Sequence, residues 1–172
     1  MSTEQAKVSS KHLGEGIAAD VIQHFPLETV TDTEAVWHDA ETTAAIFPER
    51  PERLLFGGIC AVEPDTPVEI KATLAARSAG DEGDRPGQWV LKRQSHDRLV
   101  DAGGVYLFVV YVQRGQSGRR HVGRIIMPAA TVDDIISDSW YDAPQSRSEG
   151  KIAQLSWTRL LDDNQLTRGG CL

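Results

Sequence analysis

The spacing of apolar residues predicts an amphipathic helix near the N-terminus. Its apolar positions recur at intervals of four, at Leu13, Ile17, Val21 and Phe25. That interval places them on one helical face, and the helix could be capped by Ser9 or Ser10 and ended by Pro26. The polar residues 1–10 before it are expected to form a disordered tail.

Alternating polarity predicts a β-hairpin in the first half of the chain. Residues 53–62 form a short apolar run, and residues 67–73 alternate strictly between apolar and polar positions. Residues 63–66 have the composition of a turn and separate the two runs. We therefore expect the runs to pair, with Val62 opposite Pro67.

The remaining pattern predicts the other elements of a mixed sheet. In chain order they are an extended segment over 28–38, a loop or short helix over 39–52, a polar loop over 76–87, a strand over 88–92, a helix from Ser95 as N-cap to Ala102, an apolar central strand over 105–112, a strand over 121–127, a helix capped by Thr131, and a last strand within 150–161. This order predicts an α/β fold in which a central mixed β-sheet is flanked by helices. A chain of 172 residues fits a single domain.

The strand predicted over 67–73 brings two charged side chains together. Because alternate side chains of a strand share a face, Glu69 and Lys71 point the same way. A Glu-x-Lys pair in a strand is often only a solvated ion pair, which contributes little to stability. Here the strand is followed by a helix and a strongly apolar strand, and this setting favours a functional role.

On these residues the sequence resembles the PD-(D/E)xK nuclease superfamily, which has the restriction-endonuclease-like fold. The resemblance is carried by the tetrapeptide Val68-Glu69-Ile70-Lys71 and by the helix-then-strand order of residues 90–111. By the order of its elements it covers residues 13–112 as a nuclease-like core. Residues 113–172 would then add strands and a helix to that core.

The resemblance implies a Mg²⁺-dependent endonuclease that acts on DNA, with Mn²⁺ as a substitute ion. Glu69 and the backbone carbonyl of Ile70 would bind the metal, as hard cations prefer oxygen ligands. Lys71 would orient the attacking water or stabilise the phosphate oxygens. A short nuclease of this kind could work as a homodimer, since cutting both strands needs two sites.

The family also needs an upstream Asp, and this chain departs from that pattern. The dipeptide Pro64-Asp65 falls in the predicted turn, and the predicted pairing puts Cys60 opposite Glu69. The best substitute as a catalytic and metal-binding acid is Asp39, at the end of an extended segment, although a loop or cap residue would look the same. Weaker candidates are Glu63, Asp65 and Glu15.

A basic strip is the candidate grip on the nucleic acid. It surrounds the start of the helix predicted from Ser95 and consists of Lys92, Arg93, Gln94, His96 and Arg98. Such side chains contact phosphate oxygens, although a mixed, solvated helix face would have the same composition.

The composition excludes some classes of protein but does not indicate a particular activity. The chain has 25 acidic and 18 basic residues, and its net charge of -7 argues against a general nucleic-acid coat protein. Thirteen of the basic residues are Arg, and this Arg- and Asp-rich mixture is typical of a salt-loving organism. Two cysteines give no disulfide framework, so we expect a cytoplasmic protein, and no apolar run suggests a membrane span.

The missing acid leaves two further hypotheses open. The chain could keep the nuclease fold and act as a non-catalytic nucleic-acid-binding or assembly module. Alternatively, it could be an accessory protein in which Glu69 and Lys71 form only a surface ion pair.

Overall fold

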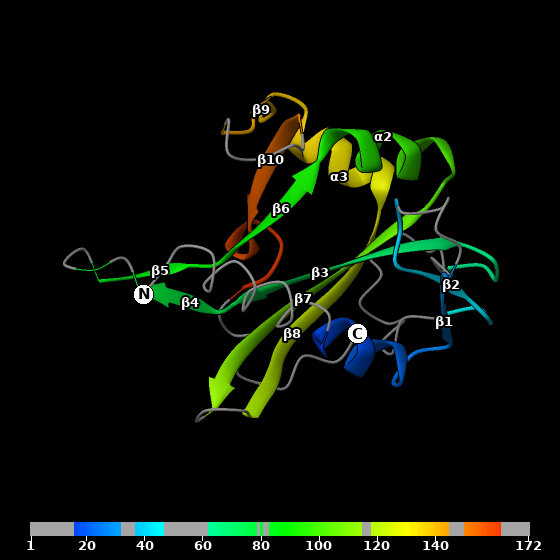
Figure 1. Cartoon of the computed structure of the whole chain (residues 1–172), viewed down its shortest axis with the longest axis horizontal. Coiled ribbons are helices and arrows are strands. Elements are labelled where there is room, and N and C mark those ends of the chain that lie inside the picture. Colours follow the sequence, from blue (N-terminus) through cyan, green and yellow to red (C-terminus); the bar gives the residue numbers. More distant parts are fainter. Residues whose placement is uncertain are drawn as a thin grey trace.

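A five-stranded mixed sheet forms the centre of the protein (Figure 1). The computed structural model describes residues 16–31, 37–46, 62–78, 80, 83–114, 118–144 and 150–162. Its main sheet has the order β1-β2-β3-β7-β8, formed by Leu27–Thr29, Ala40–Thr42, Pro67–Leu74, Val105–Arg114 and Gly118–Pro128. The expected α/β fold with a central mixed sheet is therefore confirmed.

The parallel pair β3–β7 lies in the middle of this sheet. Its register places Glu69 beside Tyr106 and Lys71 beside Phe108. The other pairs of the sheet are antiparallel, including the short contact of β2 with the start of β3. Since β7 runs parallel to β3, the chain must cross over between them, and it does so through helix α2 (Arg93–Asp101).

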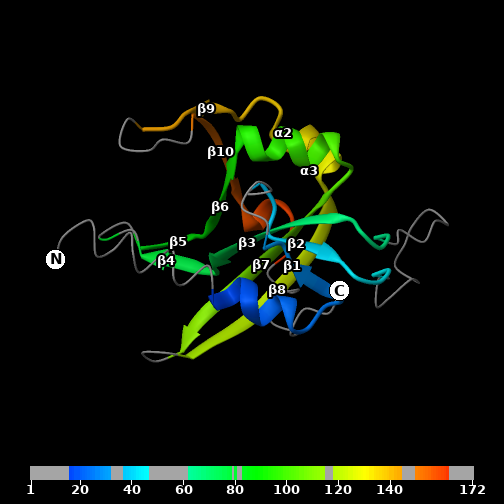
Figure 2. The same ribbon diagram turned by 45° about the vertical axis from the view of Figure 1, so that its right-hand side comes forward.

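Each face of the sheet has its own apolar cluster. Residues 16–22 are helical and bury Ile17 and Val21 against one face. Helices α2 and α3 (Ala129–Ile136) bury Leu99, Val132 and their neighbours against the other. Figures 1 and 2 show α2 and α3 on one side of the sheet and the N-terminal helix on the other.

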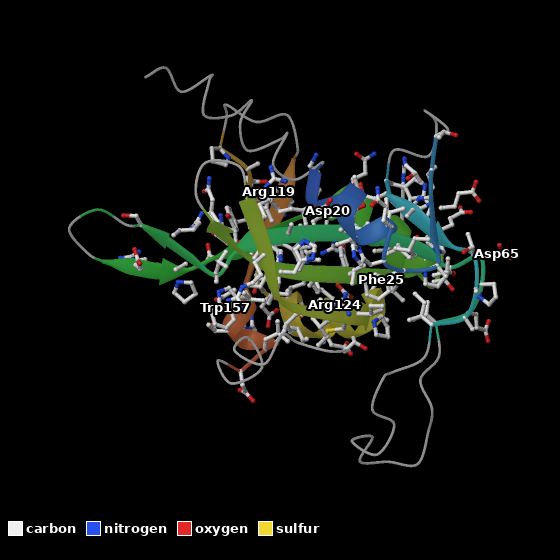
Figure 3. The ribbon with its side chains drawn as sticks, turned by 90° about the horizontal axis from the view of Figure 1, so that it is seen from below. Asp20, Phe25, Asp65, Arg119, Arg124 and Trp157 are labelled. Atoms are coloured by element: carbon white, nitrogen blue, oxygen red, sulfur yellow. The ribbon has the colours of Figure 1, made fainter. Side chains whose placement is uncertain are left out.

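A second sheet of three strands lies on the same side of the main sheet as α2 (Figure 1). Strand β10 (Lys151–Ser156) pairs with β6 (Gln88–Lys92) on one side and β9 (Tyr141–Asp142) on the other. The short 3-10 helix η3 (Trp157–Arg159) follows, and the indole of Trp157 donates to the Ala75 carbonyl at 2.8 Å. This bond joins the C-terminal part of the chain to the end of β3; Figure 3 labels Trp157.

Two glycines end α2 and return the chain to the sheet. Gly103 has a φ of 65°, and its N–H donates to the Val100 carbonyl, while the N–H of Gly104 donates to the Leu99 carbonyl. This is the Schellman arrangement, in which glycine takes the left-handed position without steric cost. A Cβ on Gly104 would lie 2.8 Å from the Pro67 carbonyl oxygen, so the turn also packs closely against the start of β3.

Three predicted elements are wrong. Residues 40–42 form strand β2 rather than a loop or helix, because β1 and β3 supply hydrogen-bonding partners on both sides. Pro67 pairs with Glu41 and not with Val62, which instead bridges to Ile46. The polar loop over 76–87 contains an exposed two-stranded ribbon of β4 (Ala76–Ser78) and β5 (Asp84–Pro86).

The N-caps predicted at Ser95 and Thr131 are also wrong, whereas those predicted at Ser9 or Ser10 lie outside the described residues. Helix α2 begins at Arg93, so Ser95 lies within it, and Thr131 lies within α3, which begins at Ala129. Within the residues that the structure describes, no helix is long and apolar enough to cross a membrane.

Candidate active site

Asp39 lies beside β3, at the point where β2 begins. Its backbone N–H donates to the Val68 carbonyl at 3.0 Å, and its carbonyl accepts from Val30 at 3.2 Å. The carboxylate then reaches along β3, where Oδ2 accepts the backbone N–H of Ile70 at 2.7 Å. Strand pairing therefore fixes the backbone of Asp39, and a charge-assisted hydrogen bond fixes its side chain.

The residues before Asp39 hold the chain against the core. His38 is buried, and its ring lies 4.1 Å from that of Trp37, centroid to centroid. Trp37 in turn packs on the cluster beneath α2 and α3, and His38 Nε2 lies 3.4 Å from a carboxylate oxygen of Glu41. These contacts limit the freedom of Asp39 next to Glu69.

Glu69 is the most perturbed acid of the described residues. It is 8% exposed and receives an ion-pair hydrogen bond from the ammonium of Lys71. Burial raises the pKa of Glu69 from 4.5 to about 7, against the lowering effect of Lys71, and the nearby charge of Asp39 raises it further. Lys92 also lowers this pKa, so the start of α2 lies within electrostatic reach of Glu69.

These groups form a compact set of oxygen donors. The carboxylates of Asp39 and Glu69 interact electrostatically, and Asp39 is bonded to the backbone of Ile70. The N–H and C=O of one strand residue point to the same side, so the Ile70 carbonyl faces the edge on which Asp39 lies. Two carboxylates and a carbonyl fit a hard divalent cation, which fills its other positions with water and phosphate oxygens. No group of three or more His, Cys, Asp and Glu side chains suited to a metal occurs in the described ranges.

A hydrogen-bond chain whose His96 and Tyr106 are buried lies next to Glu69. Tyr106 neighbours Glu69 across the β3–β7 pair, and its hydroxyl lies 3.0 Å from His96 Nδ1. His96 Nε2 lies 3.1 Å from a carboxylate oxygen of Asp133 on α3. Burial raises the pKa of Tyr106, and the charge of Glu69 contributes to the rise, so these two side chains are electrostatically coupled.

The basic strip predicted on α2 divides between surface and interior. Lys92, Gln94 and Arg98 are exposed. Arg93 is half-buried, pairs with Asp97 and lies over the Trp140 ring at 4.9 Å. His96 is fully buried, with 0% exposure, because its polar partners come from β7 and α3; it is therefore not available to a phosphate.

The weaker acid candidates lie elsewhere. Glu63 and Asp65 are exposed in the turn before β3, where Asp65 takes a φ of 60°. Figure 3 shows Asp65 at the outer end of this turn. Glu15 lies outside the described residues, as does Cys60.

Three basic side chains of β8, those of Arg119, His121 and Arg124, face the opposite side of the sheet. The guanidinium of Arg124 lies over the Phe25 ring at 4.9 Å, and Arg119 approaches the backbone of Gly16 (Figure 3). Burial lowers the pKa of His121 on the same strand. These residues pack the N-terminal helix and do not face Glu69.

The comparisons with known proteins identify the family. The family model for the PD-(D/E)XK nuclease superfamily domain matches residues 3–162. The chain belongs to the PD-(D/E)XK nuclease superfamily. Members of this superfamily typically use divalent metals. No curated protein and no solved structure matches the chain.

Tyr106 and Asp133 were not predicted as site residues, and His96 was predicted to contact the nucleic acid. The three residues are separated by 10 and 37 positions, so their contacts depend on the fold. A local signal did exist for Tyr106, since its hydroxyl interrupts the apolar run of β7 and a buried hydroxyl needs a partner.

Proposed function

We propose that this superfamily member is a Mg²⁺-dependent endonuclease that hydrolyses phosphodiester bonds in DNA. The observation that carries the proposal is the bond from the Ile70 N–H to Asp39, which brings a second carboxylate next to Glu69 and Lys71. This supplies the acid that the sequence lacks at its usual position. Asp39, Glu69 and the Ile70 carbonyl are the proposed metal ligands.

Each residue has a distinct task in this proposal. A bound Mg²⁺ would neutralise phosphate charge and lower the pKa of a coordinated water. The pKa of Glu69, raised to about 7, leaves a sizeable neutral fraction near pH 7, and a cation bound to its carboxylate would favour the ionised form. Lys71 is 24% exposed at its side chain, so its ammonium can turn from Glu69 towards a phosphate oxygen or the attacking water.

The start of α2 would hold the DNA strand. Lys92 lies within electrostatic reach of Glu69, and Gln94 and Arg98 are exposed one turn apart on the helix. Phosphate contacts of this kind position a strand without reading its sequence. Arg93 would act mainly through its pair with Asp97, and His96 takes no part in the grip.

The decisive test is nicking of supercoiled plasmid DNA in Mg²⁺ and in Mn²⁺. We expect Lys71→Ala and Glu69→Gln each to lower the rate by about 100-fold or more, in the range found for loss of one electrostatic group. Arg120→Ala on β8 is the matched control, because Arg120 is exposed and pairs with Val112, far along β7 from the Tyr106 that neighbours Glu69. Equal rates for wild type and Lys71→Ala would contradict the proposal, and size measurement in solution would test the expected homodimer.

A non-catalytic binding module is the second candidate. It is favoured by the absence, among the described residues, of a cluster of three metal-ligating side chains. Salt-dependent DNA binding without nicking in either ion would support it over the nuclease.

A further inference from the structure

We propose that Asp133, His96 and Tyr106 form a hydrogen-bond chain that positions Glu69 for cation binding. Asp133 acts as a positioning residue through the other two and does not itself touch the cation or DNA. The inference rests on the proposed function, since it concerns the same carboxylate.

The direction of the chain follows from its chemistry. A carboxylate only accepts hydrogen bonds, so Nε2 of His96 carries a proton and donates it to Asp133 across 3.1 Å. In the neutral imidazole the other nitrogen is then an acceptor, and the Tyr106 hydroxyl donates to Nδ1 across 3.0 Å. The charge at Asp133 thus selects one tautomer of His96 and one direction for the phenolic proton.

The same chain connects α3 to β3. Asp133 belongs to α3, His96 to α2 and Tyr106 to β7, and Tyr106 neighbours Glu69 on β3. His96 and Tyr106 are 0% and 1% exposed, and their rings stack at a centroid distance of 5.8 Å. Because both rings are enclosed, loss of their hydrogen bonds must be met by movement inside the core next to Glu69.

The phenolic proton has a consequence for Glu69. As long as it is held by His96, Tyr106 cannot donate it to the carboxylate beside it. The Glu69 carboxylate then stays available to Lys71 and to a cation. Groups that orient a metal-binding carboxylate in this indirect way typically change metal affinity 10- to 100-fold when they are lost.

The test uses Asp133→Asn and Tyr106→Phe in the full chain, because both keep the shape of the side chain. The side chain of Asp133 is 43% exposed, so its substitution should not prevent folding, unlike that of His96. The readout is the dissociation constant of Mn²⁺ for the metal-free protein, measured by calorimetry, together with the temperature of unfolding. Asp134→Asn is the matched control, since Asp134 is the exposed neighbour on the same helix.

We expect Asp133→Asn to weaken Mn²⁺ binding about tenfold, because the Tyr106 proton is then free to reach Glu69. We expect Tyr106→Phe, which has no such proton, to bind Mn²⁺ as wild type does and to remove most of the loss in the double variant. A merely structural role would lower the unfolding temperature without this non-additivity. Wild-type affinity in Asp133→Asn, or a loss that persists in the double variant, would overturn the inference.

The two proposals can fail separately. A wild-type protein that binds Mn²⁺ and nicks DNA, with Asp133→Asn unchanged, overturns the positioning chain and leaves the nuclease intact. A wild-type protein that binds neither Mn²⁺ nor Mg²⁺ overturns both.

Discussion

The two faces of β3 use alternate residues of one strand in opposite ways. Val68 and Ile70 point to the apolar cluster beneath the N-terminal helix, where burial alone stabilises them. Glu69 and Lys71 point to the other face, where the buried carboxylate forms an ion pair and Glu69 neighbours Tyr106 across the β3–β7 pair. The face with Val68 and Ile70 is purely apolar, whereas the face with Glu69 and Lys71 contains a buried carboxylate in an ion pair.

This difference separates stability from function along a single strand. Burial of a carboxylate disfavours its charged form, and the raised pKa of Glu69 expresses that cost. The apolar face carries no comparable cost. We therefore expect substitutions on the apolar face to destabilise the protein and some substitutions on the polar face to stabilise it while removing activity.

The largest expected effect on stability is on the apolar face. Leu107 is fully buried there and neighbours Ile70 in the sheet. Leu107→Ala should lower the free energy of unfolding by about 2–5 kcal/mol, because it leaves a cavity in a packed core. Denaturant unfolding measures the loss, and a loss below about 1 kcal/mol would mean that this face is not the stabilising one.

Glu69→Gln should have the opposite sign in the absence of divalent metal. The pKa of Glu69 is raised from 4.5 to about 7, so the folded state binds more protons than the unfolded state between these values. Stability is then lost as pH rises through this window, by up to about 3 kcal/mol. Gln cannot ionise, so at pH 8 the variant should be more stable than wild type by up to that amount, less the lost ion pair with Lys71.

The dependence of the stability difference on pH is the control for the Glu69→Gln prediction. The difference should shrink towards pH 4.5, and saturating Mg²⁺ should reduce it at pH 8 by stabilising wild type alone. Glu28→Gln is the matched variant, because Glu28 is exposed on β1. A wild-type stability that does not fall between pH 5 and 8 in EDTA would contradict the assigned burial of the Glu69 charge.

Elements whose own residues carry a distinct pattern could be predicted from the sequence. Strict alternation was enough to put Glu69 and Lys71 on one face, and the apolar runs predicted β6 and the central strand β7 closely. These elements are specified by their own side chains. Strand β2 is different: Ala40, Glu41 and Thr42 have no distinctive pattern, and the neighbours β1 and β3 impose the extended form.

The same limit applies to the candidate site. Local sequence favoured Asp39 only as the end of an extended segment, and the bond to Ile70 spans 31 residues. His96 was predicted to contact phosphate as part of the basic strip, and therefore to lie at the surface. Its burial depends on a carboxylate 37 residues away and on the hydroxyl of Tyr106, neither of which helical periodicity can indicate.

A smaller effect on stability is expected at Asp39, which lies beside the edge of β3. Asp39 accepts the N–H of Ile70, so Asp39→Ala leaves that donor without this bond and should cost about 1–3 kcal/mol. Asp39→Asn keeps an acceptor and should cost less, yet it should weaken Mn²⁺ binding as strongly as the alanine variant. Unfolding and calorimetry on both variants separate the two roles, and equal Mn²⁺ affinity in wild type and Asp39→Asn would remove Asp39 from the metal site.

The smallest effect on stability is expected on the exposed side of α2. Arg98 lies at the surface in the last turn of the helix, so Arg98→Ala should change the free energy of unfolding by no more than about 0.5 kcal/mol. If Arg98 contacts a phosphate, the slope of log affinity against log salt for duplex DNA should fall by about 1, because one fewer counterion is released. Arg120→Ala on β8, with the same change of charge at a site remote from α2, should leave the slope unchanged, which separates a specific contact from the general effect of net charge. A slope that responds equally to both variants would show that α2 attracts DNA only through the overall field, and the polar face of β3 would then need another surface to hold its substrate.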